Sequence, residues 1–168
     1  MRRTSSNASS AWQLLPGTLH DIDAVKRKCR RLVLKRAALS AGLSAVPIPG
    51  LDVASDLGLM AKAIEEINLE FGLTPEQIAR LKPEMRLVIY QMTMGVGGML
   101  VGKLITRELV AHLLAKTGFK ALARQAAKIV PLAGQVAAAS IGFAAFRTVA
   151  NRHIEACALV AAAALRAA

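Results

Sequence analysis

Residues 51–71, LDVASDLGLMAKAIEEINLEF, decide the fold class of this protein. Their large apolar side chains recur at intervals of four, three, four, three and four residues: Val53, Leu57, Met60, Ile64, Ile67 and Phe71. This spacing places them on one face of an α-helix that packs against a partner. The polar residues lie off that stripe: Asp56, Glu65, Glu66, Asn68 and Glu70. We therefore predict a helix over 51–71 that ends at Gly72.

Composition extends this prediction to the whole chain of 168 residues. Hydrophobic residues make up 54% of it and aromatic residues only 4%, so the apolar content is mostly Ala, Leu, Val, Ile and Met. Such residues favour helix over sheet, and no segment alternates as a strand would. We predict an all-α fold without a sheet.

Capping and proline signals divide the chain into further helices. A first helix is expected from near Asp21 or Asp23, either of which could cap it, to Pro47. Thr74-Pro75-Glu76-Gln77 has the pattern of a capping box and predicts a short helix. Pro83 suits the first turn of a long helix that reaches about Thr117. Two more helices are expected at 119–130 and at about 135–166.

A short repeat suggests how these helices are arranged. Residues 46–50, VPIPG, recur as VPLAG at 130–134, and each copy joins a basic helix to a second helix. We predict two helix–VPxxG–helix hairpins, at about 24–71 and 119–166, with a helical insert between them. The turn residues would be Pro47, Pro49, Gly50, Pro131 and Gly134. Residues 1–19 would form a flexible segment, and residues 20–168 a single all-helical domain.

The formal net charge of +11 is unevenly distributed. Residues 1–50 hold nine Lys and Arg against two acids, residues 51–100 four against seven, and residues 101–168 nine against two. The densest basic cluster comprises Lys26, Arg27, Lys28, Arg30, Arg31, Lys35 and Arg36. Three interpretations are open: a site for an anionic membrane surface, a solvated helix face, or a nucleic-acid patch. The acidic middle of the chain and the scarcity of aromatic residues make nucleic acid the least favoured.

Apolar stretches raise the question of membrane insertion. The longest uncharged segments are 129–146, 87–102 and 37–51, and they contain 18, 16 and 15 residues. A spanning helix needs roughly 20 apolar residues, so two hairpins that insert partway into one leaflet fit these lengths better. Gly98 and Gly102 form a GxxxG pair, which predicts a close crossing of two helices, in a membrane or in a soluble core.

No arrangement of residues points to catalysis, a cofactor or a metal site. His153 and Cys157 lie four residues apart, but no further pair completes a metal site, and a structural role is favoured. Asp52 and Asp56 share a helix face, and a place near the helix start explains Asp52 more simply than catalysis. The isolated cysteines, Cys29 and Cys157, favour a reducing compartment. We expect no enzymatic activity.

The segments at 37–78, AALSAGLSAVPIPGLDVASDLGLMAKAIEEINLEFGLTPEQI, and at 128–157, KIVPLAGQVAAASIGFAAFRTVANRHIEAC, resemble a bacterial family. It is the YcjF-type helical domain of unknown function, which is often attached to a GTPase domain and is loosely similar to the helical part of immunity-related GTPases. The similarity covers roughly residues 26–160. It implies an all-helical, membrane-associated protein with no catalytic residues, and any nucleotide-dependent role would belong to a partner.

The leading functional hypothesis is a non-enzymatic, membrane-associated helical hairpin protein that self-associates or acts as a membrane adaptor. Its partners would be anionic lipids and a second copy or a helical protein, such as a GTPase. It would lie at the cytoplasmic side of a bacterial inner membrane, or alternatively in the cytoplasm. The alternatives are a soluble all-α interaction module that forms a homo-oligomer, and a small pore-forming or toxin-related protein.

Overall fold

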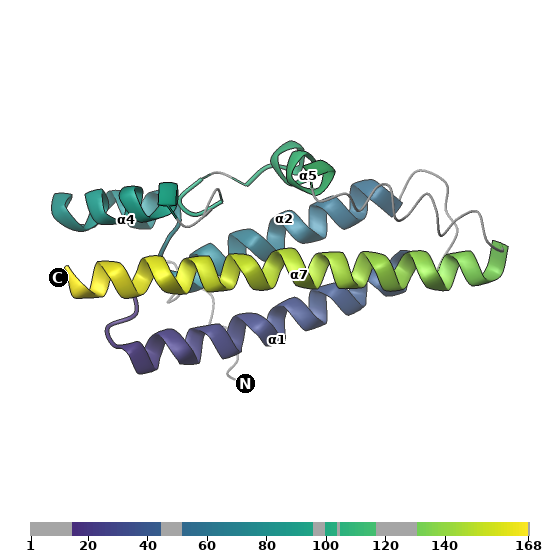
Figure 1. The fold of residues 1–168 in the computed structure, drawn as a ribbon, viewed down its shortest axis with the longest axis horizontal. Helices are drawn as coiled ribbons and strands as arrows, with labels where there is room; N and C mark the ends of the chain where they lie inside the picture. The colour runs from purple at the N-terminus through teal and green to yellow at the C-terminus, as the bar shows by residue number, and fades with distance from the viewer. Residues whose placement is uncertain (1–14, 45–51, 96–99, 104, 117–130, 168) are drawn as a thin grey trace, which may run out of the picture. The chain divides into compact units, whose positions relative to one another are not determined.

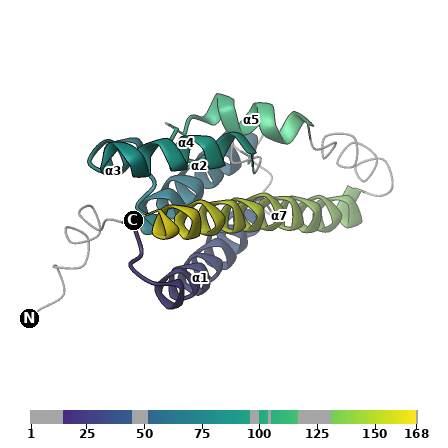
Figure 2. The same cartoon turned by 60° about the vertical axis from the view of Figure 1, so that its left-hand side comes forward.

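The protein is all-α, as the sequence predicts. A computed structural model describes residues 15–44, 52–95, 100–103, 105–116 and 131–167, and these ranges contain no strand. The helices are α1 (Leu19–Ser44), α2 (Asp52–Phe71), α3 (Pro75–Ala79), α4 (Pro83–Gly95), α5 (Arg107–Lys116) and α7 (Pro131–Arg166) (Figure 1). The short α3, labelled in Figure 2, follows α2 directly and leads into α4.

Local capping explains where α1 and α3 begin. The hydroxyl of Thr18 accepts a hydrogen bond from the Asp21 amide (3.1 Å) and donates one to the Asp21 carboxylate (2.7 Å). The helix therefore starts at Leu19, ahead of the predicted Asp21 or Asp23, because Thr18 satisfies one of the free amides of the first turn. The predicted capping box of α3 is confirmed, with Thr74 and Gln77 bonding each other reciprocally. Gly72, at φ 72°, ends α2 as predicted.

The long helix predicted from Pro83 to Thr117 is wrong. Helix α4 stops at Gly95, residues 100–103 form a turn, and α5 begins only at Arg107. Glycine is unfavourable in a helix interior by about 1 kcal/mol, and four glycines lie between positions 95 and 102.

Gly102 is consequently not part of a helix crossing. It adopts φ 67°, a left-handed conformation that favours glycine, and its amide donates to the Leu73 carbonyl at 3.1 Å. A Cβ at this position would lie 2.8 Å from Cδ1 of Ile78. The glycine does permit a close approach, but between a turn and the α2–α3 connection. Gly98, the other member of the predicted pair, lies outside the described residues.

Helix α7 begins at Pro131, four residues before its predicted start. Pro131 and Gly134 therefore belong to its first turn and not to a turn between two helices. Proline suits this position because the first amides of a helix have no intrahelical acceptor. The helix predicted over 119–130 and the turn at Pro47, Pro49 and Gly50 lie outside the described residues. The first hairpin therefore stays a prediction, whereas the turn predicted at Pro131 and Gly134 is wrong.

The chain divides into two compact units, each assembled from separate segments. Unit 1 comprises residues up to Arg31, Ile64–Leu104 and Arg152–Ala168, and unit 2 comprises Leu32–Ala63 and Ile105–Asn151. Large buried side chains form the core of unit 1: Ile64, Ile67, Phe71, Leu73, Ile78, Ile89, Ile154 and Val160. The buried side chains described in unit 2 are smaller on average: Val33, Ala37, Met60, Ala61, Ala63, Val110, Ala145, Phe146 and Ala150.

The predicted apolar stripe of α2 is confirmed from Met60 to Phe71, whereas Leu57 is only half-buried. Ile64, Ile67 and Phe71 are fully buried in unit 1, and Met60 is buried in unit 2. Burying an aliphatic or aromatic side chain of this size contributes about 1.5–3 kcal/mol, so this stripe is a main source of the stability of α2.

Candidate functional site

Three polar side chains lie together inside unit 1. Asn68 comes from α2, and His153 and Cys157 come from successive turns of α7. Asn68 Oδ1 is 2.9 Å from Nε2 of His153 and 3.6 Å from Sγ of Cys157, and Sγ is 3.4 Å from the same Nε2. All three side chains are buried, Cys157 completely. The spacing of His153 and Cys157 was visible in the sequence. The structure shows that Asn68, 85 positions before His153, lies beside them.

Hydrogen bonding fixes the protonation of this cluster. The Asn68 amide nitrogen donates to the Leu100 carbonyl at 3.0 Å, which leaves its oxygen facing His153. Because an amide oxygen can only accept, Nε2 of His153 must carry the proton. The Cys157 thiol donates to the same oxygen. The cluster thus ties α2, α7 and the turn after α4 together, and each member satisfies another's buried polar group.

Burial keeps these groups uncharged near neutral pH. Desolvation lowers the pKa of His153 to about 4, because the imidazolium form loses its hydration in the core. Desolvation also raises the pKa of Cys157 well above its ordinary value, with the nearby Cys29 thiol adding to the effect. The pKa of Cys29 rises to about 12, first through desolvation and then through the charge of Glu70.

These pKa shifts limit the chemistry that His153 and Cys157 can perform. A cysteine nucleophile must be a thiolate, usually stabilised by an imidazolium, whereas here both groups are neutral and shielded from solvent. No group of three or more potential metal ligands occurs among the described residues. The arrangement gives Asn68, His153 and Cys157 a structural role, in which hydrogen bonds position α7 and the turn at Leu100.

Asn68 is the residue that sequence reasoning missed. The spacing of the large apolar residues puts Asn68 off the predicted stripe of α2, yet only 1% of its surface is exposed. A signal was present, because Ile64, Ile67, Asn68 and Phe71 follow the i, i+3, i+4, i+7 spacing of a broad buried face. A polar residue in that register needs a partner, and the partner on α7 could not be located from sequence.

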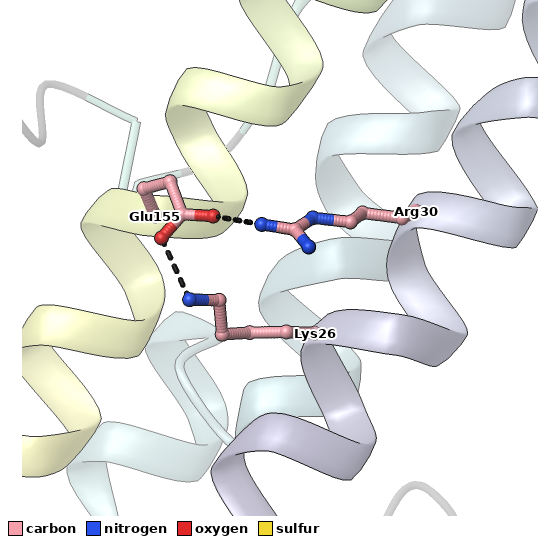
Figure 3. A network of polar contacts seen from close by, with 3 residues as sticks. All are labelled: Lys26, Arg30 and Glu155. Carbon is pink, nitrogen blue, oxygen red and sulfur yellow. Dashed lines mark hydrogen bonds and ion pairs between the residues drawn. The ribbon is translucent and has the colours of Figure 1, made fainter.

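The basic cluster of α1 is partly neutralised by ion pairs. Figure 3 shows the Glu155 carboxylate of α7 between Lys26, whose Nζ lies 2.8 Å from Oε2, and Arg30, whose Nη2 lies 2.7 Å from Oε1. Hydrogen bonding from Lys26, and then from Arg30, lowers the pKa of Glu155. On another side of α1, Lys28 Nζ lies 2.6 Å from Oε2 of Glu70 on α2. Three of the seven predicted cluster residues therefore face carboxylates within unit 1.

Arg27 and Arg31 form the other part of the cluster in unit 1. Both are exposed, and neither makes an ion pair with any residue that the structure describes. They lie one turn apart on the face of α1 opposite the buried Ile22 and Cys29. We call Arg27 and Arg31 the outward arginine pair. In unit 2, Lys35 is exposed and Arg36 is half-buried.

The other residues considered from sequence do not assemble into a site. Asp52 is the first residue of α2, in keeping with the predicted place near a helix start, and its side chain and that of Asp56 lie outside the described residues. Among the described residues, no helix combines the length and the apolar character needed to cross a membrane. No family model, curated protein or solved structure gives a significant match to this chain. The resemblance to the YcjF-type domain stays a prediction.

Proposed function

We propose that this is a non-enzymatic helical protein that associates with an anionic membrane surface. The outward arginine pair carries this proposal. Lys26, Lys28 and Arg30 are held by carboxylates of the same unit, but Arg27 and Arg31 are exposed and make no ion pair with a described residue. Two unpaired cations on one helix face attract an acidic surface, at about 1 kcal/mol for each arginine near anionic lipid.

A membrane suits the charge distribution better than nucleic acid does. Residues 51–100 carry seven acids against four cations, which would repel a polyanion laid along the chain. A localised basic face on an otherwise mixed surface is sufficient for docking onto lipid headgroups. From the resemblance we extend the proposal to the cytoplasmic side of a bacterial inner membrane, with a GTPase as a candidate partner.

A second candidate is a soluble interaction module that forms a homo-oligomer. Leu34 and Leu39 of α1 favour it, because they are 50% and 58% exposed in unit 2. The two side chains lie about 140° apart around the helix, at 100° per residue, and burying either against another protein would remove apolar surface from water. Self-association is also compatible with membrane binding. The two candidates therefore differ in whether the protein binds anionic lipid.

The proposal is tested by co-sedimentation of the purified chain with vesicles. We expect binding to vesicles that contain an anionic phospholipid and little binding to purely zwitterionic vesicles, with binding falling as salt rises. The double substitution Arg27→Gln, Arg31→Gln should weaken binding about ten- to thirty-fold, which corresponds to about 1 kcal/mol for each arginine. Equal binding by this variant and the unchanged protein would contradict the proposal.

Two matched variants show whether the position of the charges matters. Lys26→Gln with Arg30→Gln also removes two positive charges, but from residues that are paired with Glu155. This variant should weaken vesicle binding less. Arg27→Lys with Arg31→Lys keeps the charge and should bind nearly as well as the unchanged protein. If both glutamine variants lose binding equally, net charge alone determines binding and the outward arginine pair has no special role.

A further inference from the structure

Helix α4 presents an apolar stripe to solvent instead of to the core. Leu87 and Tyr90 are 58% and 56% exposed, and Met94 is 89% exposed. At 100° per residue these three side chains fall within an arc of about 60°. Ile89, on the other side of the helix, is the fully buried residue that holds α4 to unit 1. The centre of the outward face is therefore apolar, the reverse of an ordinary surface helix.

The borders of this stripe are polar, and the surrounding segment is mainly basic. Gln91 and Glu84 lie on one flank of the arc and Arg86 on the other. From position 80 to position 95 the chain holds three cations, Arg80, Lys82 and Arg86, against the single acid Glu84. The sequence from 87 to 102 contains no charge at all.

We propose that α4 lies in the plane of an anionic membrane, with Leu87, Tyr90 and Met94 inserted at the boundary between headgroups and acyl chains. This inference rests on the proposed function and identifies a second lipid contact, distinct from the outward arginine pair. A helix with an apolar face and cationic neighbours is the form that interfacial helices take. Tyrosine suits this depth because its ring is apolar and its hydroxyl stays with the headgroups.

The size of the stripe favours lipid over a second copy of the chain. With 13 residues, α4 is about 20 Å long and offers three large apolar side chains. A stable protein interface buries about 800 Å² on each partner and uses about 20–30 residues a side. Insertion into a membrane has no such minimum, because the surrounding lipid covers whatever apolar surface is presented.

A tryptophan at position 90 reports directly on its surroundings. We would introduce Trp12→Phe and Tyr90→Trp in the full chain, and add vesicles that contain anionic phospholipid. The inference predicts a blue shift of the emission and quenching by lipid brominated near the headgroup end of its acyl chains. A chain that sediments with the vesicles while this emission stays unchanged would overturn the inference and leave the proposed function standing.

The remaining outcomes are equally decisive. Failure to sediment with any vesicle would contradict the proposed function and this inference together. A blue shift that appears without lipid and grows with protein concentration would show that a second copy covers the stripe, and would overturn the inference.

Substitution of the stripe supplies a quantitative check. Leu87→Gln with Met94→Gln should weaken vesicle binding on the order of ten-fold, because two inserted apolar side chains are lost. The matched control is Leu159→Gln on α7, which changes a leucine of similar exposure (52%) and should leave binding nearly unchanged. Equal losses in the two variants would contradict the inference. Circular dichroism confirms that each variant is folded, and the tryptophan experiment decides if one is not.

Discussion

Helix α7 makes two kinds of polar contact within five residues of sequence. His153 and Cys157 bond Asn68 inside the core of unit 1, while Glu155, between them in sequence, bonds Lys26 and Arg30 at the surface. The distances are similar, yet water can replace the partners of Glu155 and cannot reach those of His153. Burial, more than contact distance, therefore sets how much a polar interaction contributes to stability.

The comparison is tested most severely by removing Asn68. Asn68→Leu leaves the buried His153 Nε2–H with only the weakly accepting Cys157 sulfur at 3.4 Å and removes the donor to the buried Leu100 carbonyl, and each such loss costs about 1–3 kcal/mol. We expect the free energy of unfolding, measured by urea titration, to fall by about 4 kcal/mol. Asn151→Leu, at a half-buried site on α7, is the matched control and should change it by less than about 0.5 kcal/mol. Equal effects of the two substitutions would refute the importance of the buried cluster.

The second prediction concerns the loss of stability at acidic pH. His153 has an ordinary pKa of 6.5 and a pKa of about 4 in the folded protein, so between these values the unfolded chain binds the extra proton. The contribution of neutral His153 to the free energy of unfolding is fully present above pH 6.5 and is lost as the pH falls toward 4. The loss is about 1.4 kcal/mol per pH unit and about 3 kcal/mol in total.

Urea titrations between pH 7 and pH 4.5 measure this loss of stability. His153→Gln should flatten the profile over that range, because glutamine does not titrate. Titration of the His153 ring resonances by NMR provides a direct check. A midpoint near 6.5 in the folded protein would show that the imidazole reaches solvent and that the cluster is not closed.

The smallest effect is expected at the surface. Glu155→Gln removes the charge that Lys26 and Arg30 share, and we expect a loss below about 1 kcal/mol, because the Glu155 side chain is 47% exposed. Added salt should reduce the difference from the unchanged protein. Glu65→Gln, at an exposed site of α2, controls for the loss of one negative charge. A loss as large as that of Asn68→Leu would overturn the distinction between the two contacts.

Local patterns predicted the helices better than they predicted the contacts. The stripe of α2, the capping box at Thr74 and the stop at Gly72 depend on neighbouring residues, and the structure confirms all three. The break after Gly95 was missed, because an uncharged apolar run resembles a helix even when its glycines favour a turn.

The candidate site depended on information that no local pattern holds. Seven cations within eleven positions were visible in the sequence, but their division into paired and unpaired groups was not. Arg30 meets a carboxylate 125 positions away, and Asn68 meets an imidazole 85 positions away. Such pairs are set by how helices pack in three dimensions, which one sequence does not reveal.

The discontinuous build of unit 1 has a consequence for synthesis on the ribosome. Its core combines segments from the beginning, the middle and the last seventeen residues of the sequence, Arg152–Ala168. While the chain grows, the apolar faces of α1 and α2 have no α7 segment to cover them, and Asn68 has no imidazole to bond. Unit 1 can therefore close only after the end of α7 has been synthesised, and until then these apolar faces stay exposed in the growing chain.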